Sequence, residues 1–304
     1  MQNFRQDLAA GAILVSVLCT APGAADAKPP SPPLESALSR AGENRQELLT
    51  ALEKVPGPQR EGMEFLIVNM PQRDLTKLKA DFLLENTQCA YAVMDQVAWG
   101  KQVPKEIFLN DVLPYANLNE RRDNWRKDFC TRFLPLVKDC KTPSEAGAVL
   151  NEKIFPRLNV RYSKERPKPD QSPYESIEAK LASCTGLSIL LIDACRAVGV
   201  PARFAGTPLW TDRSGNHSWV EIWDEGWHFT GAAEPAGRHL DRAWFVNRAA
   251  AARADDPRHA IYAASFGRTP LRFPLAWDLR IDYVSAVNVT GRYARPAQPQ
   301  QLAE

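Results

Sequence analysis

Histidine and net charge are both scarce in this sequence of 304 residues. Only four histidines are present, which leaves little room for a metal cluster built from His ligands. Lys and Arg number 38 and Asp and Glu number 36, so a net charge of +2 gives no strong field toward nucleic acid or an anionic membrane. With 44% hydrophobic and 24% charged residues, the composition excludes wholesale disorder, collagen and a multi-span membrane protein. The length suggests a soluble protein of about two domains.

Long hydrophobic runs are also missing, and the first 27 residues instead have the pattern of a secretory signal peptide. Arg5 supplies a positive charge, and residues 8–18 form an apolar stretch that is too short to span a bilayer comfortably. An Ala-x-Ala cleavage site ends at Ala27. We therefore expect an exported protein (periplasmic, cell-surface or secreted) with no stable membrane insertion after cleavage. An uncleaved anchor, or a lipoprotein modified at Cys19, is the alternative.

Five of the six cysteines would remain after cleavage, an odd number for a protein exposed to an oxidising environment. Cys130 and Cys140 are close enough in sequence to pair across a helix end, but the connectivity among these two and Cys89 stays open. Cys195 lies in an apolar helical segment and is expected to be a buried small hydrophobe. Neither a C-x-x-C motif nor a Cys/His spacing predicts zinc, and we expect no metal.

The chain divides into a helical first half and a mixed second half. Residues 28–34 are rich in proline and are expected to form a stiff linker. Residues 35–155 have helix-like apolar spacing and predict a helical accessory domain. Four prolines between residues 156 and 173 predict a loop at the start of a second domain, 156–293. The polar tail 294–304 is expected to be disordered.

The second domain has its own character, since six of the eight tryptophans lie after residue 205. Ser183–Val198 is the clearest helix, and it is apolar on several faces, which is typical of a central, buried helix. Gly199 and Pro201 are expected to end it. Further periodicity predicts strands within 202–210, 217–224, 227–233 and 281–290, and a helix over 242–254.

Cys184 is a candidate nucleophile. It follows Ser183 at the start of the predicted central helix. The first turn of a helix presents free N–H groups and positive potential, which favour the thiolate, the nucleophilic form of cysteine. Taken alone, this residue is more simply interpreted as a plain buried cysteine. Its functional interpretation therefore depends on its partners.

His217 is the candidate base. It opens the predicted strand 217–224, in which alternation places His217 and Glu221 on one face and Val220 on the other. An imidazole beside a thiol can take its proton and so activate it. By itself, this histidine fits equally well as a core residue that is satisfied between aromatic side chains.

Glu234 is the candidate acid that would orient His217. Residues 225–226 are expected to form a two-residue hairpin loop. In that register His217 lies directly opposite Glu234, with Cβ atoms about 4.5–5.5 Å apart. Glu221 competes on the same face, but four residues along a strand is about 13 Å, too far for a direct bond. A bulge at Gly231 would shift the register by one residue.

Four segments between residues 183 and 235 then converge on a family. Residues 183–188 read Ser-Cys-Thr-Gly-Leu-Ser, with the cysteine at the helix start, and residues 195–203 approach the pattern R-x-x-G-I-P-A-R. Residues 217–221 fit H-x-W-x-E, and residues 234–235 are Glu-Pro where Asp-Pro is usual. In order and spacing these segments resemble the transglutaminase-like superfamily, whose core is papain-like.

The resemblance implies an α+β fold, in which a papain-like transglutaminase core with a central helix on an antiparallel sheet follows the helical domain. It implies a catalytic triad of Cys184, His217 and Glu234 that acts on amide bonds of proteins or peptides through a thioester. Hydrolysis and acyl transfer to an amine both remain open. This chemistry needs neither a metal nor an organic cofactor. The alternative is a catalytically silent module of the same fold that binds peptide or glycan.

Overall fold

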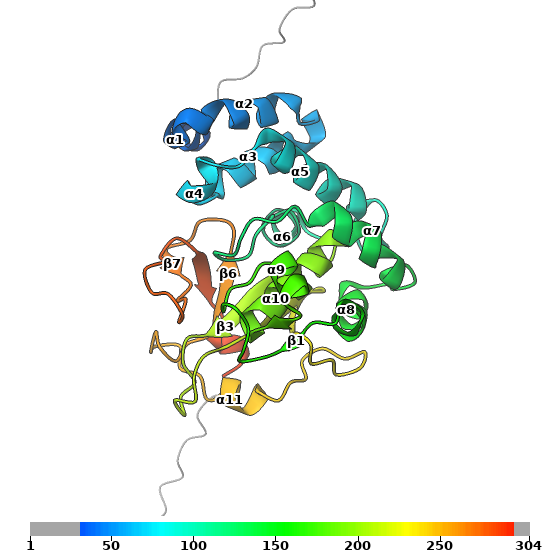
Figure 1. Cartoon of the computed structure of the whole chain (residues 1–304), viewed down its shortest axis with the longest axis vertical. Coiled ribbons are helices and arrows are strands. Elements are labelled where there is room, and N and C mark those ends of the chain that lie inside the picture. Colours follow the sequence, from blue (N-terminus) through cyan, green and yellow to red (C-terminus); the bar gives the residue numbers. More distant parts are fainter. Residues whose placement is uncertain (1–30, 295–304) are drawn as a thin grey trace, which may run out of the picture. The chain divides into compact units, whose positions relative to one another are not determined.

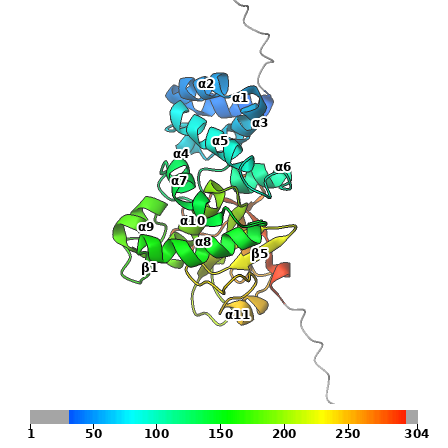
Figure 2. The same cartoon turned by 90° about the vertical axis from the view of Figure 1, so that its right-hand side faces the viewer.

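Residues 31–294 are described by the computed structural model of the chain, and the chain from Pro32 onward forms one compact unit. The predicted signal peptide and the tail after residue 294 lie outside the described residues. Helices fill the first half and a sheet the second half (Figures 1 and 2). The helices are α1 (Pro32–Arg40), α2 (Arg45–Lys54), α3 (Arg60–Asn69), α4 (Gln72–Leu75), α5 (Ala80–Met94), α6 (Lys105–Ile107), α7 (Arg126–Val137), α8 (Pro143–Leu158), α9 (Pro173–Ala179), α10 (Cys184–Ala197) and α11 (Val246–Ala250).

The prediction of a linker over residues 28–34 is wrong for its last residues, because α1 begins at Pro32, and residues 28–30 lie outside the described part of the chain. Proline fits the first turn of a helix, where its missing N–H would have had no partner. Helices α1 to α5 gather at one end of the compact unit (Figures 1 and 2) and share one hydrophobic cluster with residues 108–116. This part of the chain is therefore a helical layer with its own core.

The predicted domain boundary at 155/156 falls inside α8, which runs through Pro156 to Leu158. A proline in the last turn removes only one hydrogen bond, and the helix then ends at Asn159 in a left-handed conformation (φ 56°). Helices α7 and α8 pack against each other and against α10, and all three contribute to the same hydrophobic cluster as the sheet. The two helices before residue 156 thus pack with the second half of the chain.

The central helix α10 forms where the sequence predicts it. Ser183 is its N-cap and accepts a hydrogen bond from the Gly186 N–H at 3.1 Å. Gly199, at φ +74°, follows the C-terminal end in a conformation that side chains with a Cβ rarely adopt. Nearly every residue of α10 is buried, and the helix packs against α7, α8 and the sheet (Figure 1). The expectation of a central, buried helix is confirmed.

A six-stranded antiparallel sheet supports α10 in the order β5-β4-β3-β6-β8-β7. Val220 and Phe204 contribute to the cluster that includes α10, whereas Trp219 and Ala205 contribute to a separate aromatic cluster. The α+β class is therefore confirmed. The strands are β3 (Ala202–Thr207), β4 (His217–Trp223), β5 (Trp227–Thr230), β6 (Tyr262–Ser265), β7 (Leu271–Arg272) and β8 (Ser285–Asn288), with a separate parallel pair β1 (Arg161–Tyr162) and β2 (Leu181–Ala182).

Strands β3, β4, β5 and β8 lie inside the predicted runs but are shorter than those runs. The helix predicted over 242–254 is confined to Val246–Ala250. Strand β6 was not predicted, although it pairs with β3 and β8 in the middle of the sheet. Within residues 31–294 there is no helix with the length and apolar character needed to cross a membrane.

Two buried arginines join the helical layer to the central helix. Arg126 of α7 donates to the carbonyls of Val112, Leu113 and Pro114 at 2.8–3.0 Å. It also donates to the carbonyl of Arg196 at 3.0 Å, and Arg196 itself donates to the carbonyls of Asp111 and Ala116. Burial and the charge of Arg196 lower the pKa of Arg126 to about 9, so the guanidinium remains charged at neutral pH. Segment 111–116 is thus fixed against α7 and α10.

We predict that Arg126→Met lowers the free energy of unfolding by about 3–5 kcal/mol, because it leaves several buried carbonyls without a donor. Denaturant unfolding followed by tryptophan fluorescence measures the change. The control is Arg132→Met on the same helix, where the side chain is 39% exposed and pairs with Asp128 at 3.2 Å. That exposed pair should contribute less than about 1 kcal/mol. Equal losses in the two variants would contradict the structural role of Arg126.

Candidate active site

A cavity of about 660 Å³ lies at the N-terminal end of α10. Its wall includes residues of α8, the first residues of β4, the loop before β4 and the turn after β5. Cys184, His217 and Glu234 all line it. The three predicted site residues therefore share one cavity, although they come from three separate segments of the chain.

Cys184 is the first residue of α10 and is only partly buried, unlike the rest of the helix. The Ser183 hydroxyl accepts a hydrogen bond from the Gly186 N–H, and the Ser183 carbonyl accepts one from the Leu187 N–H. The N–H groups of Cys184 and Thr185 belong to the first turn of the helix, which has no acceptors for them within the helix. Gly186 allows the first turn of α10 to pack closely against Ala182, since a Cβ at position 186 would lie 3.2 Å from the Ala182 Cβ. The helix start therefore presents a thiol beside free donors.

His217 begins β4 and is 9% exposed. Aromatic rings surround it, with centroid distances of 4.8 Å to Trp244, 5.0 Å to Phe245, 5.9 Å to Trp219 and 6.0 Å to Trp210. Its Nε2 atom is buried and has no hydrogen-bond partner among the described residues. Burial and, to a smaller extent, the charge of Arg248 lower the pKa of His217 to about 4. The imidazole is therefore neutral at physiological pH and can accept a proton.

The predicted strand register is wrong by one residue. Trp223, not Asp224, pairs with Trp227, and Glu225 takes a left-handed conformation (φ 56°) inside a three-residue loop. Strand β5 ends at Thr230, so Glu234 lies beyond it and has no cross-strand partner. The sequence analysis had expected Glu225 and Gly226 alone to form a two-residue loop, whereas Asp224 also belongs to the loop. The direct pairing of His217 with Glu234 does not occur in this structure.

Glu234 reaches the cavity by another route, through a turn after β5. Its N–H donates to the Gly231 carbonyl at 3.2 Å, and its side chain folds back so closely over Gly231 that a Cβ there would clash. Its Oε1 atom accepts a hydrogen bond from Trp244 Nε1 at 3.0 Å. Burial raises the pKa of Glu234, and the bond from Trp244 partly offsets this. Because Trp244 also packs against His217, the carboxylate lies beside the indole that contacts the imidazole.

Asn151 of α8 fixes this turn, and the sequence analysis missed it. Its side-chain amide donates to Thr230 Oγ1 at 2.9 Å and to the Gly231 carbonyl at 2.8 Å, and its oxygen accepts from the Ala233 N–H at 2.9 Å. It is buried and lines the cavity. An asparagine on a helix has no local signal for such a role. It was also placed in the predicted accessory domain, so its proximity to residues 230–233 could not be inferred.

Glu221, the competing acid, belongs to a separate ion network. It accepts hydrogen bonds from Arg203 at 2.7 Å and from Tyr293 at 2.7 Å, and it pairs with Arg292 at 3.3 Å. The guanidinium of Arg203 also stacks on Trp227 at 3.6 Å from the ring centroid. The expectation that Glu221 does not contact His217 therefore holds. Its carboxylate stabilises the sheet rather than the cavity.

The remaining cysteines do not contribute to this cavity. Cys130 and Cys140 line a different pocket, and all five cysteines in the described part of the chain are free thiols. Cys195 is fully buried, as expected, and burial raises the pKa of its thiol far above the usual value. No group of three or more His, Cys, Asp or Glu within residues 31–294 is arranged to hold a metal ion. The geometry thus offers one cysteine and one histidine for chemistry.

We predict that His217 stays neutral from pH 8 down to pH 5, because charging it inside an aromatic pocket is unfavourable. NMR titration of the histidine side chains measures this, with His228 as the internal control. Burial lowers the pKa of His228, but the hydrogen bond to Asp241 at 2.7 Å raises this pKa by more, so the net change is an increase. His228 should therefore titrate above about 6.5. Arg248→Gln should raise the pKa of His217. Parallel titration of the two histidines would contradict this account.

No curated protein matches the chain. One similar solved structure is a putative cysteine protease from Cytophaga hutchinsonii, with 19% identity, a TM-score of 0.31 and coverage of 36% of this chain and 38% of that one. The model of the transglutaminase-like superfamily matches residues 134–231, which include Cys184, His217, the end of α7 and the whole of α8. This segment of the chain is thus similar to the core of the transglutaminase-like superfamily.

Proposed function

We propose that the protein is an exported cysteine enzyme that acts on amide bonds of proteins or peptides through a thioester on Cys184. One observation carries this proposal: the first residue of α10 and the first residue of β4, a thiol and a neutral imidazole, line the same cavity. A binding module has no need of both groups. Export rests on the signal-peptide pattern of residues 1–27.

In the proposed mechanism, neutral His217 takes the proton of the Cys184 thiol as the sulfur attacks the amide carbonyl. The low pKa of His217 favours this general-base step over a preformed thiolate–imidazolium pair. The N–H groups of Cys184 and Thr185 are the donors for the oxyanion of the tetrahedral intermediate. Protonated His217 then gives its proton to the departing amine. Water, or a second amine, attacks the thioester and releases Cys184.

Glu234 is the proposed orienting acid, and Trp244 controls its access to His217. The carboxylate bonds the indole Nε1, while the same indole packs on the imidazole. Substrate that displaces Trp244 would release Glu234 to accept a hydrogen bond from His217, as the acid does in a Cys-His-acid triad. Trp244 is 55% exposed, so its displacement costs little burial.

A protein or peptide is the proposed substrate because the cavity is open and has exposed aromatic side chains at its edge. Tyr162 and Trp244 line the cavity and are each 55% exposed. Large exposed aromatic side chains are typical of surfaces that bind polypeptide, since they bury much area at little entropic cost. Arg248 adds a positive charge to the cavity lining and pairs with Asp212 at 3.1 Å.

The second candidate function is a catalytically silent module that binds peptide or glycan. A specific observation favours it: no hydrogen bond joins Cys184, His217 and Glu234 to one another in the described structure. The Glu in place of the usual Asp at position 234 points the same way. The two candidates differ in the reactivity of Cys184.

We predict that iodoacetamide alkylates Cys184 faster than the other cysteines between pH 6 and 8, as followed by mass spectrometry. Burial raises the pKa of Cys89, Cys130 and Cys140, so these thiols are internal references in the same sample. His217→Ala should slow alkylation of Cys184 by about tenfold or more, since a positioned base contributes at least that much. If Cys184 reacts like a free thiol in both proteins, the silent module is the better account.

We predict that Trp244→Phe raises the pKa of His217. The same substitution should increase the alkylation rate of Cys184 several-fold. Phenylalanine keeps a ring against His217 but cannot hold Glu234, and a hydrogen bond of this kind is worth about 1 kcal/mol. The double variant Trp244→Phe/Glu234→Gln should lose the pKa increase. An unchanged His217 titration in Trp244→Phe would exclude Glu234 as the orienting acid.

A further inference from the structure

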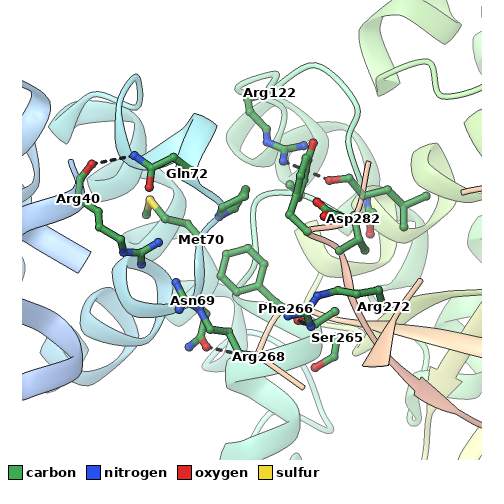
Figure 3. Close-up of a pocket in the computed structure, with 17 residues that line it drawn as sticks. Arg40, Asn69, Met70, Gln72, Arg122, Ser265, Phe266, Arg268, Arg272 and Asp282 are labelled. Carbon is green, nitrogen blue, oxygen red and sulfur yellow. Dashed lines mark hydrogen bonds between the residues drawn. The ribbon is translucent and has the colours of Figure 1, made fainter. Parts of the chain in front are cut away.

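A second cavity, of about 390 Å³, lies where the helical layer meets the strands β6 to β8 (Figure 3). The helical side contributes the end of α1 and the segment from α3 to α4, and the strand side contributes residues 265–272 and 282–285. It shares no lining residue with the candidate active site. This cavity has no role in the proposed mechanism.

Three arginines in this cavity have no acidic partner. Arg40, Arg268 and Arg272 line it, and none of them forms an ion pair with a carboxylate of residues 31–294. Asp282 is the only acidic side chain in the lining. Arg122 is the fourth arginine of the lining, but it is paired with carboxylates outside the lining. The three unpaired guanidinium groups and Asp282 therefore leave a net charge of +2 around the cavity.

The other charged groups nearby neutralise one another. Arg122 pairs with Asp74 at 3.0 Å and with Glu120 at 3.5 Å. Arg73 pairs with the same Asp74 at 3.6 Å. The charges of these two arginines and two carboxylates therefore sum to zero. This group of residues does not neutralise the positive charge of the three unpaired arginines in the cavity. Consistent with that, burial and the positive charges of Arg40 and Arg272 lower the pKa of Arg268.

Two of the three arginines, Arg268 and Arg272, belong to an anchored segment that runs from the end of β6 into β7. The N–H of Arg268 donates to Asn69 Oδ1 at 3.0 Å, and the N–H of Gly267 donates to Asn110 Oδ1 at 2.8 Å. The guanidinium of Arg272 donates to the Thr269 carbonyl at 2.5 Å. Such prior ordering lowers the entropic cost of binding a ligand.

We propose that this cavity binds a phosphate group. Guanidinium groups match phosphate oxygens in geometry, and an excess charge of +2 balances a phosphate dianion better than a single carboxylate. Figure 3 shows Arg40 on the helical side and Arg272 on the strand side, with Phe266 between them. A bound phosphate would join the helical layer to the strands and relieve the repulsion among the arginines.

The test is calorimetric titration of the full chain with inorganic phosphate at constant ionic strength, in parallel with glycerol phosphate. Saturable binding of inorganic phosphate or of glycerol phosphate is expected. Tighter binding of inorganic phosphate would indicate free phosphate as the ligand, and tighter binding of glycerol phosphate would indicate a phosphate ester. Arg268→Gln/Arg272→Gln should weaken binding by about tenfold or more, since each charge-assisted contact contributes strongly. The control is Arg157→Gln, an exposed arginine of α8 outside this cavity, which should bind as the wild type does.

A second measurement separates a binding role from a structural one. Without phosphate, Arg268→Gln/Arg272→Gln should melt at the same temperature as the wild type or higher, because the removal of two repelling charges outweighs the loss of the exposed bond from Arg272 to Thr269. With phosphate, only the wild type and Arg157→Gln should gain thermal stability. The proposal fails if no variant differs from the wild type in phosphate binding. It also fails if citrate binds more tightly than phosphate, or if the double variant unfolds at a lower temperature in the absence of phosphate.

Discussion

Burial of the two guanidinium groups of Arg126 and Arg196 is the constraint on which the rest of the structure depends. The carbonyls of segment 111–116 turn inward and would be unsatisfied without these donors. Each unpaired buried carbonyl would cost about 1–3 kcal/mol. Because Arg196 belongs to α10 and Arg126 to α7, the donors fix the C-terminal half of the central helix against the helical layer. The helical layer is therefore part of what positions the site.

At its N-terminal end, α10 begins with Cys184, the only residue of this helix that is not buried. Helix α10 is packed against α7, α8 and the sheet and is buried after its first residue, and the Ser183 side chain caps its first turn. Cys184 is thus presented by a rigid element. Rigid placement matters for catalysis because misplacement by about 1 Å can cost a hundredfold in rate. Another part of the cavity wall is a turn after β5 that Asn151 holds through three hydrogen bonds.

Much of this was predictable from short-range signals. The N-cap Ser183, the apolar periodicity and Gly199 defined α10, and alternation defined β4 with His217 at its start. Long-range features were not predictable. The four small and aromatic residues of β6 have no clear alternation, and the strand exists because β3 and β8 pair with it on both sides. The register error came from the third loop residue, Asp224, and the predicted boundary at 155/156 lies inside α8 because a proline is tolerated in the last turn of that helix.

For the site, the sequence indicated Cys184 and His217 correctly as lining one cavity, whereas the environment of His217 depends on residues far away in sequence. Trp210, Trp244 and Phe245 enclose the ring, and this enclosure is what holds the imidazole neutral. The enclosure also leaves Nε2 buried without a partner, which costs about 1–3 kcal/mol in a protein of ordinary stability. A purely structural histidine would have its nitrogens satisfied by the core around it. In the proposed mechanism, the proton that His217 takes from Cys184 would give this buried nitrogen the partner that the surrounding core does not supply.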